Sequence, residues 1–205
     1  GMIAVKTNYK AQDLPEDRRP LRLAIEKAIP LSAGKYNLSL TQSVEQRVFE
    51  LWVKAINLGV DLDQGHIVDN WPLQLGSLGS GNHFIEVSLD EHDGVWLFLH
   101  SGSRGVGNKI ATHQIKIAQD LMKKWWIDLP DPDLAYLVEG TREFSNYIAE
   151  LRWAQHFALL NREEMMDRLI IAFGEWVDPD EGRAGVTDDS QRINCHHNYT
   201  ERETV

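Results

Sequence analysis

Residues 83–100 read His-Phe-Ile-Glu-Val-Ser-Leu-Asp-Glu-His-Asp-Gly-Val-Trp-Leu-Phe-Leu-His, two apolar segments on either side of a short polar one. Short runs rich in Val, Ile, Phe and Trp are typical of strands, and Asp and Gly between them are typical of a turn. We therefore predict a β-hairpin with strands over 83–89 and 95–100. If residues 90–93 form a four-residue loop, Leu89 pairs with Gly94 and His83 lies directly opposite His100.

That register would bring two imidazoles to one face of the hairpin, because directly opposed Cβ atoms lie about 5 Å apart. Two histidines held in this way can share a metal site. In the alternative register Asp90 pairs with Gly94, which places His100 opposite Phe84 and the two imidazoles on opposite faces. A further alternative is that each histidine is separately hydrogen-bonded at its strand end and binds no metal.

Helical spacing of apolar residues dominates the rest of the chain. We predict a strand over 2–7 and helices over about 13–28, 43–57 with Ser43 as N-cap, 108–126 and 141–176. Because the last of these exceeds about 25 residues, a kink or a division into two helices is expected. The segment 177–191 predicts a flexible loop. The expected fold class is α+β, with antiparallel β-hairpins or a sheet packed with several long helices in a single domain over 1–205.

Aromatic and methionine side chains recur on the predicted helices, including Trp153, Phe157, Met165 and Met166. They could form a surface on which nucleobases stack. Core packing is the better interpretation, because residues of these types at helical spacing are most often buried.

The formal net charge of −10 is the wrong sign for a protein whose main task is to hold a nucleic-acid backbone on a broad basic surface. Small basic clusters such as Arg18, Arg19 and Arg22 are interpreted as solvated helix faces. We expect no contact with a membrane, because no apolar run reaches the roughly 20 residues that cross a bilayer. The single cysteine, Cys195, agrees with a reducing compartment, and we expect a cytoplasmic protein.

Two glycine-rich segments flank the hairpin, residues 75–82 before it and residues 101–107 after it. Exposed backbone N–H groups where a strand turns into a helix suit phosphate, although the second segment lacks the Lys and Ser or Thr of a P-loop. A plain tight turn is the alternative. Near the end of the chain, Ile193-Asn-Cys-His-His-Asn-Tyr199 places two histidines together, of which at most one points into a given site if the segment is extended. A surface run without ligands is the alternative there.

Four strings, in this order along the chain, resemble successive motifs of the RtcB-type RNA-splicing ligases. They are Gly79-Ser-Gly-Asn-His-Phe-Ile-Glu-Val87, Leu99-His-Ser-Gly-Ser-Arg-Gly105, Trp153-Ala-Gln-His-Phe-Ala-Leu-Leu-Asn-Arg162 and Asn194-Cys-His-His-Asn-Tyr199. The resemblance covers nearly the whole chain and corresponds to the central portion of the family.

The resemblance implies a GTP- and Mn²⁺-dependent ligase that joins RNA 2′,3′-cyclic phosphate or 3′-phosphate ends to 5′-hydroxyl ends in tRNA splicing and RNA repair. His83 would match a ligand of one Mn²⁺ ion, and His100 and His197 would match ligands of a second. Arg104 is a candidate phosphate contact. The guanylate site would be lined by Asn82, His83, Phe84, Ile85, Glu86, His197 and Asn198.

The sequence also departs from the family pattern. Full members carry an aspartate and a cysteine that ligate manganese upstream of the match to Met2, and a guanylylated histidine within Ser-His-Gly-Ala-Gly-Arg downstream. Neither feature occurs in these 205 residues, so we expect an RtcB-like fold that is truncated at both ends and contains no catalytic nucleophile. The chain would be inactive alone and would need a complementary chain that supplies the C-terminal half. The alternative is a non-catalytic metal- or nucleotide-binding fragment or an interaction domain.

Overall fold

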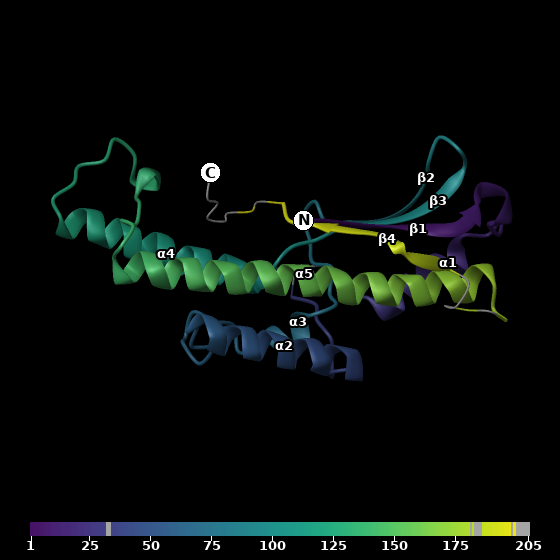
Figure 1. Ribbon diagram of the computed structural model, residues 1–205, viewed down its shortest axis with the longest axis horizontal. Coiled ribbons are helices and arrows are strands. Elements are labelled where there is room, and N and C mark those ends of the chain that lie inside the picture. Colours follow the sequence, from purple (N-terminus) through teal and green to yellow (C-terminus); the bar gives the residue numbers. More distant parts are fainter. Residues whose placement is uncertain (32–33, 181, 183–185, 198, 200–205) are drawn as a thin grey trace.

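The computed structural model describes residues 1–31, 34–180, 182, 186–197 and 199. Four antiparallel strands form one sheet in the order β2-β3-β1-β4, so the α+β class with an antiparallel sheet is confirmed. In Figure 1 the long helix α5 runs beneath the sheet along the length of the molecule, and α2 lies on the other side of α5. The elements are β1 (Met2–Lys10), α1 (Arg19–Ala28), α2 (Gln42–Leu58), α3 (Trp71–Gln74), β2 (Phe84–Leu89), β3 (Gly94–His100), α4 (Arg104–Lys124), α5 (Arg142–Val177) and β4 (Thr187–Cys195), with 3₁₀ turns η1 (Ala11–Asp13) and η2 (Pro132–Leu134).

The predicted hairpin is present, but the predicted register is wrong by one residue. Leu89 pairs with Val95, and Phe84 rather than His83 pairs with His100. The cause is the turn: the Asp90 amide donates to the Gly94 carbonyl at 2.9 Å, which closes a three-residue loop over 91–93. Asp93 in that loop has a φ of 60°, the left-handed conformation typical of such loops.

The longest helix, α5, continues through 36 residues, so the expected kink or division is wrong. Its sequence contains no proline and a single glycine, Gly174, near its end, so nothing interrupts the backbone hydrogen bonds. Thr141 caps its start by accepting from the amide of Phe144 at 3.2 Å.

Other helix boundaries shift for identifiable reasons. Thr41, not Ser43, caps α2, because the Ser43 hydroxyl donates instead to Glu164 at 3.0 Å. Gly59 ends α2 in the left-handed conformation, as its sequence position predicts. Helix α1 begins at Arg19 rather than near Asp13, which belongs to the 3₁₀ turn. Proline in the first turn, Pro20, suits that start.

The core lies in two hydrophobic clusters that share α5. One cluster joins α1, the sheet and the second half of α5, and includes Met165 and Met166. The other joins α2, α3, α4 and the first half of α5, and includes Trp153 and Phe157. All four side chains are fully buried, which confirms core packing over a base-stacking surface.

The flexible loop predicted over 177–191 overlaps β4, which begins at Thr187, so the prediction is wrong for residues 187–191. Strand β4 pairs with β1, with Cys195 opposite Met2, and carries the adjacent histidines to the same end of the sheet as His100. Along the described part of the chain, no helix has both the length and the apolar character needed to span a membrane.

Candidate metal and nucleotide site

The two glycine-rich segments are held together by one buried amide, the side chain of Asn161 on α5. Its Oδ1 accepts from the amides of Gly76 and Ser77 at 2.8 and 3.3 Å. Its Nδ2 donates to the carbonyls of Ser77 and Gly102 at 3.3 and 3.1 Å. Asn161 lies within one of the four motif strings, but the sequence gives no sign of this role, because it depends on contacts more than 55 residues away in sequence.

The imidazole of His83 is oriented by the backbone that Asn161 positions. Its Nδ1 donates to the carbonyl of Leu78 at 2.8 Å, and Ser101 donates its hydroxyl to the same oxygen at 2.9 Å. A carbonyl only accepts, so neutral His83 carries its proton on Nδ1 and its lone pair on Nε2. Gly79 has a φ of +96°, and a Cβ there would lie 2.8 Å from Nδ1 of His83, so glycine at this position leaves room for the ring.

His83, His100 and His197 come together at one end of the sheet. The ring centroids of His83 and His100 are 5.6 Å apart, and those of His100 and His197 are 5.8 Å apart. The expectation that a shifted register would separate His83 from His100 is therefore wrong. His83 lies just before β2 begins, so the alternation of faces along the strand does not apply to it.

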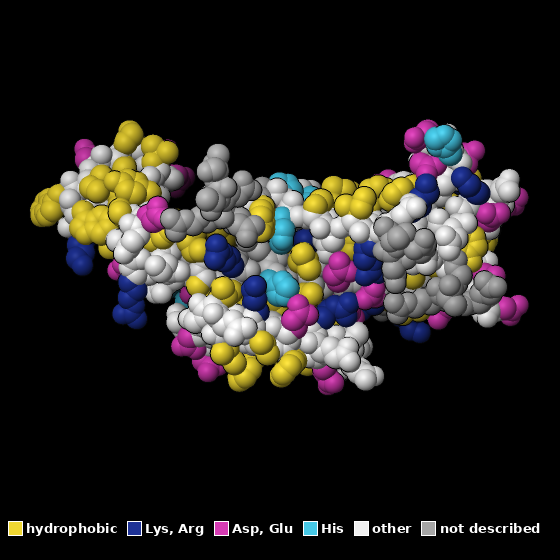
Figure 2. Space-filling view, in the orientation of Figure 1, with side chains coloured by type: hydrophobic (Ala, Val, Ile, Leu, Met, Phe, Trp, Pro, Cys, Tyr) yellow, Lys and Arg dark blue, Asp and Glu magenta, His cyan; other side chains and the backbone are white. Residues whose placement is uncertain are grey.

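Adjacent histidines near the end of β4 have different neighbours. The ring of His197 stacks beside His100, whereas the ring of His196 stacks on Tyr199 with centroids 5.0 Å apart. Figure 2 shows histidine side chains near the middle of the visible face, around the end of the chain marked N in Figure 1.

Two of the three histidines have a lowered pKa, and the three rings do not converge on one point. Burial lowers the pKa of both His83 and His100, and the nearby cations Arg104 and Arg162 act in the same direction on one ring each. Neutral imidazoles are the form that ligates metals. Within the described ranges, no three His, Cys, Asp or Glu side chains lie close enough together to hold one ion.

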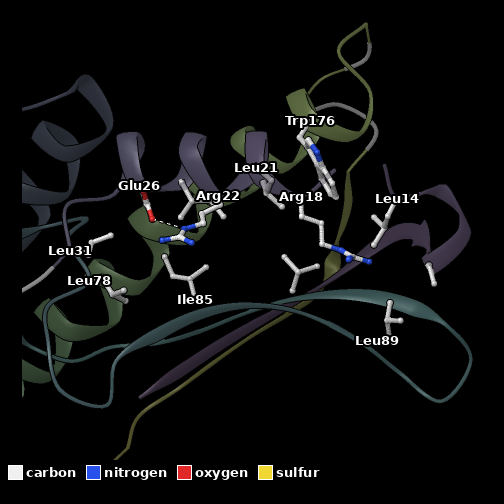
Figure 3. Close-up of a pocket in the computed structure, with 13 residues that line it drawn as sticks. Leu14, Arg18, Leu21, Arg22, Glu26, Leu31, Leu78, Ile85, Leu89 and Trp176 are labelled. Carbon is white, nitrogen blue, oxygen red and sulfur yellow. Dashed lines mark hydrogen bonds and ion pairs between the residues drawn. The ribbon is translucent and has the colours of Figure 1, made fainter. Parts of the chain in front are cut away.

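The residues expected to line a guanylate site divide between the two faces of the hairpin. The ring of Phe84 lies 5.7 Å from that of His100, and Glu86 is on the same face of β2. Ile85 points the other way, into an apolar cavity of about 580 Å³ between α1 and β2 that Figure 3 shows in close-up. Its side chain thus lies on the face away from the histidines, because successive side chains of a strand face opposite sides, and its predicted contact with guanylate stays a prediction. The backbone of Asn82 hydrogen-bonds to His100, while Asn198 lies outside the described residues.

Arg104 lines a polar cavity of about 740 Å³ next to His83. Its Nε donates to the Ser77 hydroxyl at 3.1 Å and its Nη2 to the Lys35 carbonyl at 3.2 Å. It makes no ion pair with any described residue, and burial lowers its pKa. Its φ of 58° at the start of α4 is rare for a residue other than glycine. The half-buried guanidinium is thus held in place without a counterion.

Comparison with known proteins shows the family to which this chain belongs. A family model described as tRNA-splicing ligase RtcB matches residues 1–205. The chain belongs to the RtcB RNA ligase family. It is 39% identical to the RNA-splicing ligase RtcB of Escherichia coli K12, in an alignment that covers 99% of this chain and 51% of that protein. It is 29% identical to the tRNA-splicing ligase RtcB of Methanococcus maripaludis, over 80% of this chain and 42% of that protein.

The chain spans about half the length of the curated relatives to which it is similar. The family resemblance inferred from the four motif strings is confirmed, and all four strings lie at or beside the cluster formed by the sheet end, the glycine-rich segments and α5.

Proposed function

We propose that this chain provides the metal- and guanylate-binding half of an RtcB-type RNA ligase in the cytoplasm. The reaction would join RNA 2′,3′-cyclic phosphate or 3′-phosphate ends to 5′-hydroxyl ends, with GTP and Mn²⁺, in tRNA splicing and RNA repair. The observation that carries the proposal is the convergence of His83, His100 and His197 at one sheet end in a chain of this family.

The three imidazoles are suitable ligands for Mn²⁺, although they form only part of a site. His83 offers Nε2, because Nδ1 is occupied by the Leu78 carbonyl, and His100 and His197 add two further imidazoles. Bound metal would neutralise phosphate charge and orient the groups that react. Three neutral imidazoles contribute no negative charge to a site for divalent ions, so we expect this chain by itself to bind metal weakly.

The other site residues would act on the nucleotide and the RNA. Asn82, Phe84 and Glu86 lie on the histidine side of the hairpin and would contact guanylate together with His197 and Asn198. Arg104, which has no carboxylate partner among the described residues, would contact a phosphate. The protein residues thus bind and orient, and none of them would serve as the nucleophile.

Residues outside these 205 would supply that nucleophile. The 205 residues contain no Ser-His-Gly segment, and the sheet face with Phe84, Phe98 and Ile193 carries no helix among the described residues. The exposed fractions of Phe84 and Ile193 are 37% and 58%. Apolar side chains left exposed around a functional cluster favour a protein partner that covers them.

Titration of the chain with Mn²⁺, followed by electron paramagnetic resonance, tests the metal part of this proposal. We expect weak binding that His100→Ala reduces at least tenfold. His92→Ala is the matched control, because His92 is exposed in the hairpin turn and should change nothing. Binding unaffected by His100→Ala would contradict the proposed site, and tight binding of two ions would contradict the expected weakness.

A further inference from the structure

A largely apolar cavity of about 580 Å³ lies between helix α1 and the edge strand β2, on the side of the hairpin away from the histidines. Figure 3 shows that Leu21 of α1 and Ile85 of β2 point into this space from opposite sides. The volume lies within the range of about 300–1,000 Å³ that is usual for small-molecule sites, which are also mostly apolar. The lining includes Leu21 and Ile25 of α1, Ile85, Val87 and Leu89 of β2, and Trp176 of α5.

The cavity is open to solvent because β2 forms the edge of the sheet. Alternate residues of β2 line it, yet Ile85 and Val87 are only half-buried and Leu89 is 52% exposed. Leu31, at the opposite end of the cavity in Figure 3, is 45% exposed. An apolar ligand that covered these side chains would be stabilised by the hydrophobic effect.

The charged side chains that line the cavity are two arginines and one glutamate, so their formal charges sum to +1. Arg22 pairs with Glu26, with its Nε 2.8 Å from Oε1. Arg18 makes no ion pair or side-chain hydrogen bond with any residue in the ranges that the structure describes. The neighbouring carboxylate of Asp17 accepts instead from the backbone amide of Arg19 at 2.9 Å. In a chain of net charge −10, an apolar cavity thus has one cation without a carboxylate partner.

We propose that this cavity binds an aliphatic monocarboxylate. Its carboxylate would accept hydrogen bonds from the guanidinium of Arg18, which Figure 3 shows between α1 and the Leu89 end of β2, and its hydrocarbon chain would lie toward Ile85. One surplus positive charge matches one carboxylate and not a phosphate dianion. The apolar lining disfavours a sugar or nucleotide, whose polar groups would lose hydrogen bonds to water without replacement. The site is separate from the histidine cluster, so the proposal is independent of the proposed function.

NMR spectra of the ¹⁵N-labelled chain, titrated with octanoate, test the proposal. The reporter is the indole N–H of Trp176, which lines the cavity and donates to the Asp17 carbonyl at 3.0 Å. We expect its signal to shift and to reach saturation. The indole N–H of Trp153 donates to the Leu51 carbonyl at 2.9 Å in the other hydrophobic cluster, and its signal should not shift.

Ligands of matched chain length separate the role of the charge from that of the hydrocarbon. Octan-1-ol and octylammonium lack the negative charge, and we expect octanoate to bind roughly fivefold more tightly than either. Arg18→Met should weaken octanoate binding by about fivefold and leave octan-1-ol binding unchanged, because it removes the charge and keeps the apolar stem. Arg19→Met is the matched control, since Arg19 is the adjacent exposed arginine and does not line the cavity.

A second variant tests the hydrocarbon part of the site. Val87→Phe leaves Arg18 in place and fills part of the cavity, so it should weaken the binding of both octanoate and octan-1-ol by about fivefold. The proposal would be overturned by the absence of a saturable Trp176 shift, or by octan-1-ol binding as tightly as octanoate. Octanoate binding that Arg18→Met or a folded Val87→Phe variant leaves unchanged would also overturn it. Sedimentation of the same samples should show a monomer, and a dimer that octanoate dissociates would contradict the proposal by showing that a second copy covers the cavity.

Discussion

Single residues determine the geometry of the site, and Asp90 shows this most clearly. Its carboxylate accepts from the amides of His92 and Gly94 at 2.9 and 2.7 Å and from the Trp96 indole at 3.1 Å. These bonds hold the pKa of Asp90 well below its usual value, with the Trp96 bond contributing most. This side chain therefore stabilises the turn whose backbone hydrogen bond sets the register and the position of His100.

We expect Asp90→Asn to destabilise the protein at neutral pH. Because the folded-state pKa is depressed, the ionised carboxylate stabilises the fold above its unfolded pKa of about 4, and this contribution is lost as the pH falls below that value. The difference in melting temperature between wild type and variant should thus shrink below about pH 4. A difference that is the same at pH 3 and pH 7 would contradict the role of the charge. Glu91→Gln, in the same exposed turn, is the control.

Asn161 is a second residue on which the site geometry depends, because its side chain bonds to both glycine-rich segments. Asn161→Leu removes hydrogen bonds to the backbone of Gly76, Ser77 and Gly102 and leaves buried amides unpaired, so we expect a loss of about 3 kcal/mol in the free energy of unfolding. Asn146→Leu, at an exposed position of the same helix, should have little effect. Urea denaturation measures both. A loss below about 1 kcal/mol for Asn161→Leu would show that the amide is not needed.

Among the elements, α5 connects the rest of the fold through an ion-pair network. Arg47 of α2 bonds to Glu164 and Asp167 of α5, both at 2.6 Å. Asp167 also accepts from Arg192 of β4 at 2.7 Å. These ion pairs join α2 and β4 to the same face of α5.

Glu164 is the buried centre of this network, at 1% exposure. Glu164→Gln would leave two guanidinium groups without their shared carboxylate, and we expect a loss of about 3–5 kcal/mol in stability. Glu26→Gln removes the exposed pair with Arg22 and should have no measurable effect. Thermal or chemical denaturation distinguishes the two variants, and equal stability of Glu164→Gln and wild type would refute the network's importance.

The elements were largely predictable from sequence and their exact pairing was not. Apolar periodicity identified the hairpin, the long helices and the buried face with Trp153 and Met165, because local spacing reflects burial. The turn was misjudged because the register depends on whether the Asp90 amide pairs with Gly94, which a single sequence leaves open. Strand β4 was missed because the acidic segment before it lacks a strand pattern, and its pairing with β1 joins residues nearly 200 positions apart.

For the whole molecule, the histidine cluster was predicted for a partly wrong reason. The spacing argument required His83 opposite His100, and the two rings meet although that pairing is absent. The motif order supplied the third histidine, His197, which spacing could not place.

The central claim is that this chain is the metal- and guanylate-binding half of an RtcB-type ligase, and covalent labelling with α-³²P-labelled GTP and Mn²⁺ tests it most directly. The chain is incubated alone and then with the C-terminal half of an RtcB relative that carries Ser-His-Gly-Ala-Gly-Arg. We predict no label on the chain alone, and label on the added half only when this chain is present with His100 intact. Label on this chain alone, or labelling of the added half that His100→Ala leaves unchanged, would contradict the account.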